Sequence, residues 1–225
     1  MKKASALFVL VFSFLLIQAC GPTASVVSSG GPTIEEAMNV DSSAKMRIAV
    51  ARFDNKTPYL VGWGMSDMLV SALFRTNKFI VLERENLDAV LQEQKLSAVG
   101  VIDEKTSIPA GMLEGAAFLV IGAITEFEPN ARGVKTPVGG VQQSHVALDM
   151  RIVDSTTGRI VSSIKVEGAA TDTALNAGVL KYVGVSPLIS GLKAWSNTPM
   201  DKAIRVCLEK AVDHIISYGM KGGKK

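Results

Sequence analysis

The chain has 225 residues, of which 48% are hydrophobic and 20% charged, and its formal net charge is +3. This length is enough for one domain with its own core plus a terminal extension. Two cysteines and two histidines exclude a disulfide-rich scaffold and offer no Cys/His cluster for zinc. The charge is small and evenly spread, so nucleic acid is not an expected partner. Beyond the N-terminus, no run of 18 apolar residues predicts a spanning helix.

The N-terminus has the pattern of a secretory signal. Lys2 and Lys3 precede a run of 14 apolar or small residues, Ala4–Ile17, which is too short for a spanning helix and typical of a signal-peptide core. The run ends in Ile17-Gln18-Ala19-Cys20-Gly21, which resembles a bacterial lipobox. The alternative is an ordinary signal peptide that happens to contain a cysteine.

The lipobox resemblance has consequences for Cys20. It implies that residues 1–19 are a lipoprotein signal peptide and that Cys20 receives diacylglycerol and an N-acyl chain. Several buried acyl chains anchor a protein stably, because each buried CH₂ adds about 0.8 kcal/mol. By resemblance to sorted lipoproteins, Gly21 in place of Asp after the cysteine points to the outer membrane. Residues 20–44 are rich in Ser, Gly, Pro and Thr and predict an acylated flexible tether.

Residues 45–220 predict one folded domain, followed by a short basic tail at 221–225. Hydrophobic periodicity predicts strands at Arg47–Phe53, Phe79–Leu82, Ala116–Glu128, His145–Asp154 and Arg159–Val166. It predicts helices at Gly62–Arg75, Glu83–Leu96 and Ile108–Glu114, and a final helix that starts at Pro199. Early strand–helix alternation followed by antiparallel hairpins predicts an α/β fold, with a mixed sheet flanked by helices in a layer sandwich.

The final helix has the clearest pattern. Thr198 is its expected cap, and Asp201 completes a capping box. Its apolar residues recur at helical spacing and form one stripe: Ile204, Cys207, Leu208, Ala211, Val212, Ile215 and Ile216.

No residue pattern predicts catalysis. His145 and His214 are isolated, and Cys207 belongs to the apolar stripe, so we expect structural roles for all three. Glu83 and Glu85 are better explained by a helix N-terminus than by paired-carboxylate chemistry. No glycine motif has phosphate-binding context, and no serine lies in a GxSxG elbow. We therefore expect no enzyme, no metal and no cofactor apart from the acyl chains on Cys20.

Three stretches, together with the lipobox and tether, resemble the CsgG family of outer-membrane lipoprotein channels that export curli subunits. They are Phe79–Gln94, Arg151–Ser163, and a C-terminal third comprising Ala177–Val183, Ser196–Pro199 and the closing helix. The resemblance implies a homo-oligomeric ring in the periplasm, in which each subunit adds two hairpins to one shared transmembrane barrel. Open sheet edges are not tolerated in lipid, so neighbouring subunits must close such a wall.

The hairpins implied by the resemblance would cover about Asn130–Leu148 and Lys165–Val183. Candidate wall residues are Val134, Thr136, Val138, Thr171, Thr173, Leu175 and Val179. The second segment alternates between an uncharged and a polar face, as barrel strands do, whereas the first looks short because it contains Pro137 and several glycines. Alternatively, both segments are soluble loops of a non-pore lipoprotein that faces the periplasm and acts as an anchor or assembly factor.

In the family, a loop after the first strand narrows the channel. The corresponding stretch here, Asp54–Trp63, looks shorter, and its candidate constriction residues are Tyr59, Leu60 and Trp63. The alternative is a turn whose aromatic residues pack on the following helix. The resemblance further implies outer-membrane lipid, secreted unfolded polypeptide and accessory secretion proteins as partners.

Overall fold

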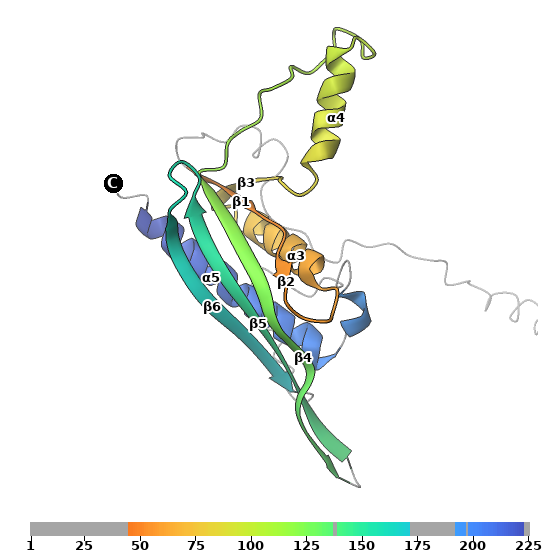
Figure 1. Ribbon diagram of the computed structural model, residues 1–225, viewed down its shortest axis with the longest axis vertical. Helices are drawn as coiled ribbons and strands as arrows, with labels where there is room; N and C mark the ends of the chain where they lie inside the picture. The colour runs from red at the N-terminus through yellow and green to blue at the C-terminus, as the bar shows by residue number, and fades with distance from the viewer. Residues whose placement is uncertain (1–44, 137–138, 172–191, 197, 223–225) are drawn as a thin grey trace, which may run out of the picture.

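The computed structural model describes residues 45–136, 139–171, 192–196 and 198–222. Its centre is a six-stranded mixed sheet with the order β3-β1-β4-β5-β6, in which β2 also pairs with β4 (Figure 1). The strands are β1 (Met46–Val50), β2 (Asp54–Asn55), β3 (Phe79–Leu82), β4 (Phe118–Thr136), β5 (Gly139–Asp154) and β6 (Ile160–Thr171). The predicted α/β class and mixed sheet are confirmed, and the described sheet is open, not closed into a barrel.

The first half of the sheet is parallel. β1 pairs with β3 on one side and with β4 on the other. β2 continues the line of β1 along β4, where Asp54 lies opposite Ala123. The predicted strand Arg47–Phe53 therefore ends early, at Val50, and in the gap before β2 the buried ring of Phe53 lies over Gly122. A Cβ at Gly122 would come within 2.7 Å of that ring, so glycine permits this close approach.

The second half is an antiparallel meander. β4 and β5 pair from Phe118↔Asp154 to Thr136↔Gly139, and β5 and β6 pair up to Gln143↔Thr171. The predicted turn between β5 and β6 forms around Asp154, whose side chain accepts the backbone N–H groups of Thr156 and Thr157 at 2.9 Å each. These two donors lower the pKa of the Asp154 carboxyl below its ordinary value.

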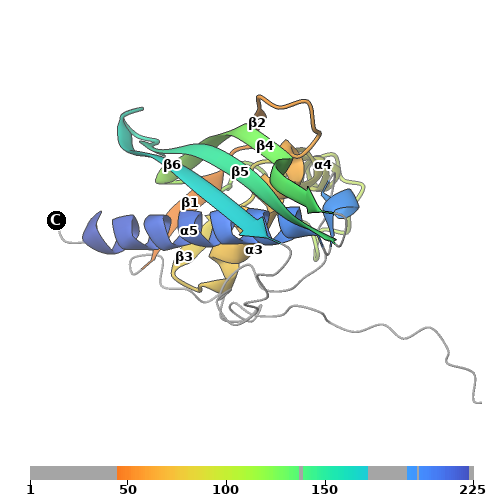
Figure 2. The ribbon, with the colours of Figure 1, turned by 90° about the horizontal axis from the view of Figure 1, so that it is seen from below.

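Helices α3 (Gly62–Arg75) and α5 (Pro199–Gly222) cover one face of the sheet (Figure 2). The predicted stripe of α5 is confirmed, because all seven of its residues are buried. Thr198 caps the helix as predicted, and the 3₁₀ turn η1 (Lys193–Trp195) precedes it. The helix continues to Gly222, two residues into the segment expected as a tail. Among the described helices, none is both long and apolar enough to cross a lipid bilayer.

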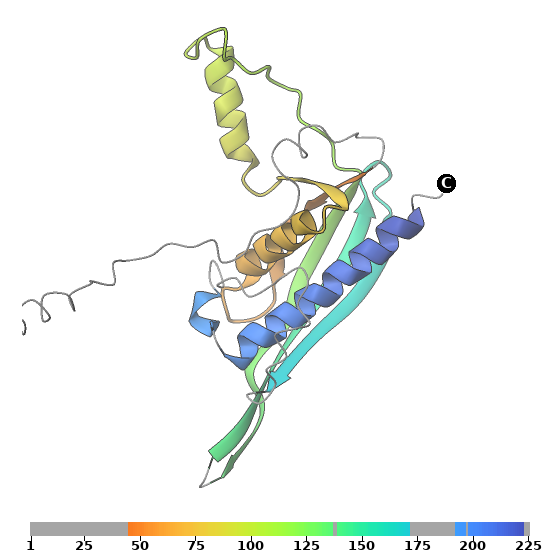
Figure 3. The ribbon, with the colours of Figure 1, turned by 180° about the vertical axis from the view of Figure 1, so that it is seen from behind.

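Helix α4 (Leu87–Ala98) departs from this layer. Figures 1 and 3 show it standing clear of the sheet, and residues 99–114 run back along it to β4. The helix starts four residues later than predicted, because Glu83 accepts the backbone N–H groups of Glu85 and Asn86 in a preceding turn.

The predicted short helix Ile108–Glu114 is wrong. The segment is turn and coil, and Gly111 has a φ of 81°. Left-handed backbone at that position is incompatible with a right-handed helix. No apolar face of this segment is buried against the core, so packing does not favour a helix either.

Candidate membrane hairpin and early loop

The first candidate hairpin is formed by β4 and β5 beyond the body of the domain. After an irregularity between Glu128 and Arg132, pairing resumes at Arg132↔Gln143 and continues to Thr136↔Gly139. The two strands project together past the end of β6 and past the helix layer (Figures 1 and 3). The segment that looked short in sequence is therefore a two-stranded ribbon within the described residues.

A polar contact between β4 and β5 lies at the base of this ribbon. The buried hydroxyl of Ser144 donates to the carbonyl oxygen of Pro129 at 2.7 Å. Pro129 lies at the irregularity, where the β4–β5 ladder is interrupted and proline's missing N–H costs nothing. This contact joins the end of the sheet body to the start of the projecting ribbon.

The structure places only part of the predicted wall. Val134 lies opposite Val141 and Thr136 opposite Gly139, while Thr171 ends β6 opposite Gln143. Val138, Thr173, Leu175 and Val179 lie outside the described residues, as does Cys20. Of the second candidate hairpin, only residues 165–171 are described, and they belong to β6.

The early loop is held against the domain by aromatic packing. The ring of Tyr59 lies 5.1 Å from that of Phe127 and 5.5 Å from that of Trp195, and the latter two are 5.4 Å apart. Within the loop, the Asn55 side chain accepts the Thr57 hydroxyl at 2.8 Å and donates to the backbone carbonyl of Tyr59. Tyr59 thus follows the packing alternative, on β4 and η1 rather than on the next helix.

Leu60 and Trp63 are placed differently from Tyr59. Leu60 is 88% exposed and Trp63 is 49% exposed. The Arg52 guanidinium lies 3.5 Å above the Trp63 ring and 2.6 Å from a carboxylate oxygen of Glu85. The cation and its carboxylate orient the indole at the surface. Leu60 and Trp63 therefore remain accessible to a neighbouring molecule, whereas Tyr59 is partly buried and packs against the core.

A charged cluster that the sequence analysis missed spans three strands on the sheet face opposite the helices. Lys165 lies 2.7 Å from Glu126 and 3.1 Å from Glu167, and His145 lies 3.3 and 3.6 Å from the same carboxylates. Ala147 pairs with both glutamates and is fully buried beneath them, so its small side chain lets them converge. The hydrogen bonds from Lys165 to Glu126 and Glu167 raise the pKa of Lys165, and the bond to Lys165 lowers the pKa of Glu167.

The remaining candidates for chemistry have structural partners. The Ser162 hydroxyl and His214 Nε2 lie 2.8 Å apart and join β6 to α5. The Cys207 thiol is buried and donates to the Val166 carbonyl at 3.5 Å. Burial raises the pKa of this thiol to about 12. The described residues contain no group of three His, Cys, Asp or Glu side chains that could hold a metal ion.

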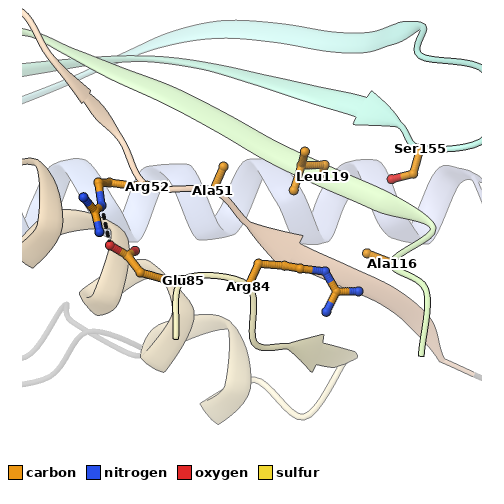
Figure 4. Close-up of a pocket in the computed structure, with 7 residues that line it drawn as sticks. All are labelled: Ala51, Arg52, Arg84, Glu85, Ala116, Leu119 and Ser155. Carbon is orange, nitrogen blue, oxygen red and sulfur yellow. Dashed lines mark hydrogen bonds and ion pairs between the residues drawn. The ribbon is translucent and has the colours of Figure 1, made fainter. Parts of the chain in front are cut away.

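An open groove of about 600 Å³ lies at the base of α4 (Figure 4). Its lining consists of Ala51, Arg52, Arg84, Glu85, Ala116, Leu119 and Ser155. Arg84 donates to the Glu114 carbonyl at 2.7 Å and to the Glu83 carbonyl at 2.8 Å, which fixes its guanidinium at the rim. The groove therefore combines apolar walls with two cations, one of which is ion-paired to Glu85.

Comparison with known proteins decides the family. The family model described as "Curli production assembly/transport component CsgG" matches residues 34–224. The chain belongs to the CsgG family. The curli production assembly/transport component CsgG of Escherichia coli K12 is 29% identical to this CsgG-family chain over 169 residues, which cover 69% of the chain. The matched part spans 61% of the length of that relative.

Two further proteins are similar over most of their length. A Neisseria meningitidis protein named "Putative lipoprotein NMB1126/NMB1164" is 25% identical over 234 residues, which cover 96% of this chain and 95% of that protein. The crystal structure of the hypothetical protein CT253 from Chlamydia trachomatis aligns with a TM-score of 0.47 and 14% identity. That alignment covers 79% of this chain and 99% of CT253.

Proposed function

We propose that this CsgG-family chain is an outer-membrane lipoprotein whose copies assemble into a ring that passes unfolded polypeptide, in the manner of curli export. The acyl chains on Cys20 anchor each copy, and the domain described above faces the periplasm. Secreted polypeptide and accessory secretion proteins are its partners. Passage is diffusive, so the proposal includes no covalent chemistry and no cofactor.

The observation that carries this proposal is the ribbon formed by β4 and β5. It continues the sheet beyond β6, with an unbroken ladder from Arg132↔Gln143 to Thr136↔Gly139. A two-stranded ribbon is only marginally stable alone in water, and its free edges are not tolerated in lipid. Ribbons of successive copies solve both problems if they pair edge to edge, because a closed ring of hairpins leaves no edge.

A second candidate function is supported by the extent of the matches. The similarity to the Neisseria lipoprotein covers 95% of that protein, whereas the match to the Escherichia coli curli component covers 61% of it. A periplasm-facing lipoprotein that anchors or assembles a surface structure without a pore accounts equally for an acylated tether and an α/β domain. In that case the ribbon is a docking element in water.

Planar-bilayer recording separates the two candidates. Acylated oligomer purified in detergent is expected to give large, stable, voltage-insensitive steps. Val134→Asp with Val141→Asp places two like charges opposite each other in the ribbon and should abolish these steps, because a charged side chain on a lipid-facing strand is destabilising. The matched control is Ile160→Asp on the exposed surface of β6. Intact rings that never conduct would contradict the pore and support the non-pore anchoring or assembly function.

The anchor is tested separately. Cys20→Ser should abolish flotation with outer membranes and leave a protein without the mass of the acyl groups. Continued flotation at an unchanged mass would show that Cys20 carries no lipid.

A further inference from the structure

Residues 87–114, comprising α4 and the segment that returns along it, form what we call the arm. Twelve large hydrophobic side chains are exposed in the part of the chain that the structure describes, and seven of them belong to the arm. These seven are Val90, Leu96, Val99, Val101, Ile108, Met112 and Leu113. Such a concentration of exposed apolar groups on one small element is typical of an interaction site.

The arm is folded without help from the sheet. The buried side chain of Gln94 accepts the backbone N–H of Gly111 at 3.2 Å, and the buried hydroxyl of Ser97 accepts that of Ile108 at 3.2 Å. Polar contacts therefore hold residues 99–114 against α4. The apolar side chains remain in solvent, and Val99, Val101 and Met112 are at least 70% exposed. An element ordered in advance loses little entropy when it binds.

The net charge of the arm differs in sign from that of the rest of the chain. Within residues 87–114, five carboxylates oppose two lysines, which gives −3. Because the whole chain carries +3, the remainder carries +6, or +4 once Lys2 and Lys3 are removed with the signal peptide. The arm and the rest of the same chain are thus complementary in sign, which favours contact between copies and steers their encounter.

The groove at the base of α4 has the matching chemistry. Ala51, Ala116 and Leu119 form its apolar walls, the charges of Arg52 and Glu85 pair with each other, and Arg84 supplies a further cation at the rim. The arm of the same chain points away from the sheet in two views, so it does not fill this groove (Figures 1 and 3). A volume of about 600 Å³ accommodates several aliphatic side chains.

We propose that the arm of one copy docks in the groove of the next copy. Each copy then presents one arm and one groove, which is a head-to-tail contact that generates a ring when the rotation closes. This inference rests on the ring of the proposed function and names the two surfaces that join its subunits.

The test uses two defective full-length acylated chains. The arm variant carries Val99→Ser, Val101→Ser and Met112→Ser, and the groove variant carries Arg84→Glu and Ser155→Trp. Ile160→Ser is the matched control, because Ile160 is 55% exposed and lies outside both surfaces. Light scattering in detergent is expected to show wild type and control as closed multimers and each variant as a monomer. A mixture of the two variants should form dimers and nothing larger, because it has one intact arm and one intact groove for each pair.

The outcomes separate this inference from the proposed function. An arm variant that forms rings and conducts like wild type would overturn the docking proposal and leave the pore. A mixture that stays monomeric would also overturn it. Wild-type chains that never assemble would overturn both. Hydrogen exchange on the wild type adds a test that needs no variant. Residues 99–114 should gain at least tenfold protection on assembly, and unchanged exchange there would contradict the proposal.

Discussion

Gly168 of β6 lies directly against the backbone of Cys207 on α5. A methyl group added to Gly168 would sit 2.8 Å from the Cβ of Cys207 and 2.9 Å from its backbone nitrogen, and it would overlap the Ala203 carbonyl. None of these three atoms is the flexible end of a side chain, so the helix would have to move as a unit. This contact sets the spacing between α5 and the meander that carries the projecting ribbon.

Gly168→Ala is therefore expected to lower the free energy of unfolding by about 3 kcal/mol, since overpacking against a rigid backbone costs 1–3 kcal/mol or more. Gly115→Ala makes the same chemical change where no atom lies within 4 Å of the added Cβ and φ is not in the left-handed region. That control should stay within 0.5 kcal/mol. Urea denaturation compares the two, and equal stability would mean that α5 does not rest on Gly168.

The Cys207 thiol should be inert in the native protein. With its pKa raised to about 12, about one molecule in 10,000 carries the reactive thiolate at pH 8. Labelling by iodoacetamide, followed by mass spectrometry, should be undetectable on the native chain and complete in denaturant. Labelling of the folded protein within minutes would contradict the burial of this residue.

Tyr59 should contribute to stability, whereas Leu60 should not. Tyr59→Ala removes a ring from contact with Phe127 and Trp195 and is expected to cost about 2–3 kcal/mol. Leu60→Ala should be neutral, because the side chain is 88% exposed. Thermal unfolding measures both, and conductance measured in parallel shows whether Leu60 or Trp63 narrows a channel. If Tyr59→Ala leaves the stability unchanged, the packing role is wrong and Tyr59 is again a candidate constriction residue.

The charged cluster around Lys165 should give a pH-dependent increment in stability. The pKa of Glu167 is lowered by Lys165, so its contribution is present above the ordinary carboxyl pKa and is lost as pH falls through the lowered value. Lys165→Met should therefore reduce Tm slightly at pH 7 and leave it unchanged at pH 3. The effect is small, because exposed ion pairs are screened. A difference that persists at pH 3 would show that Lys165 acts through packing.

Hydrophobic periodicity correctly predicted helices and strands whose apolar side chains pack into the core. Helix Gly62–Arg75 and strand Phe79–Leu82 form at the predicted residues, and all seven predicted stripe residues of α5 are buried. The predicted helix Ile108–Glu114 does not form, because Gly111 adopts a left-handed φ and the side chains of this segment are exposed. Helix propensity without burial does not make a helix.

Tertiary arrangement accounts for what sequence patterns missed. The glycines that made the first hairpin look short lie near the tip of the ribbon, where pairing continues to Thr136↔Gly139. The charged cluster joins Glu126, His145 and Lys165, whose separation in sequence hides a contact that only strand register brings about. The same holds for Tyr59, whose aromatic partners lie at positions 127 and 195.

The most direct test of the central claim asks whether the ribbon enters lipid. Val134→Cys, Lys135→Cys and Thr136→Cys are each labelled with a polarity-sensitive fluorophore. The buried Cys207 should not react, and Cys20 should not react if it is acylated as we propose. On assembly in vesicles, the account predicts a blue shift at positions 134 and 136 but not at 135, because successive strand residues face opposite sides of a barrel wall. Emission that stays water-like at all three positions, in oligomers that have bound the vesicles, would contradict a membrane-spanning ribbon.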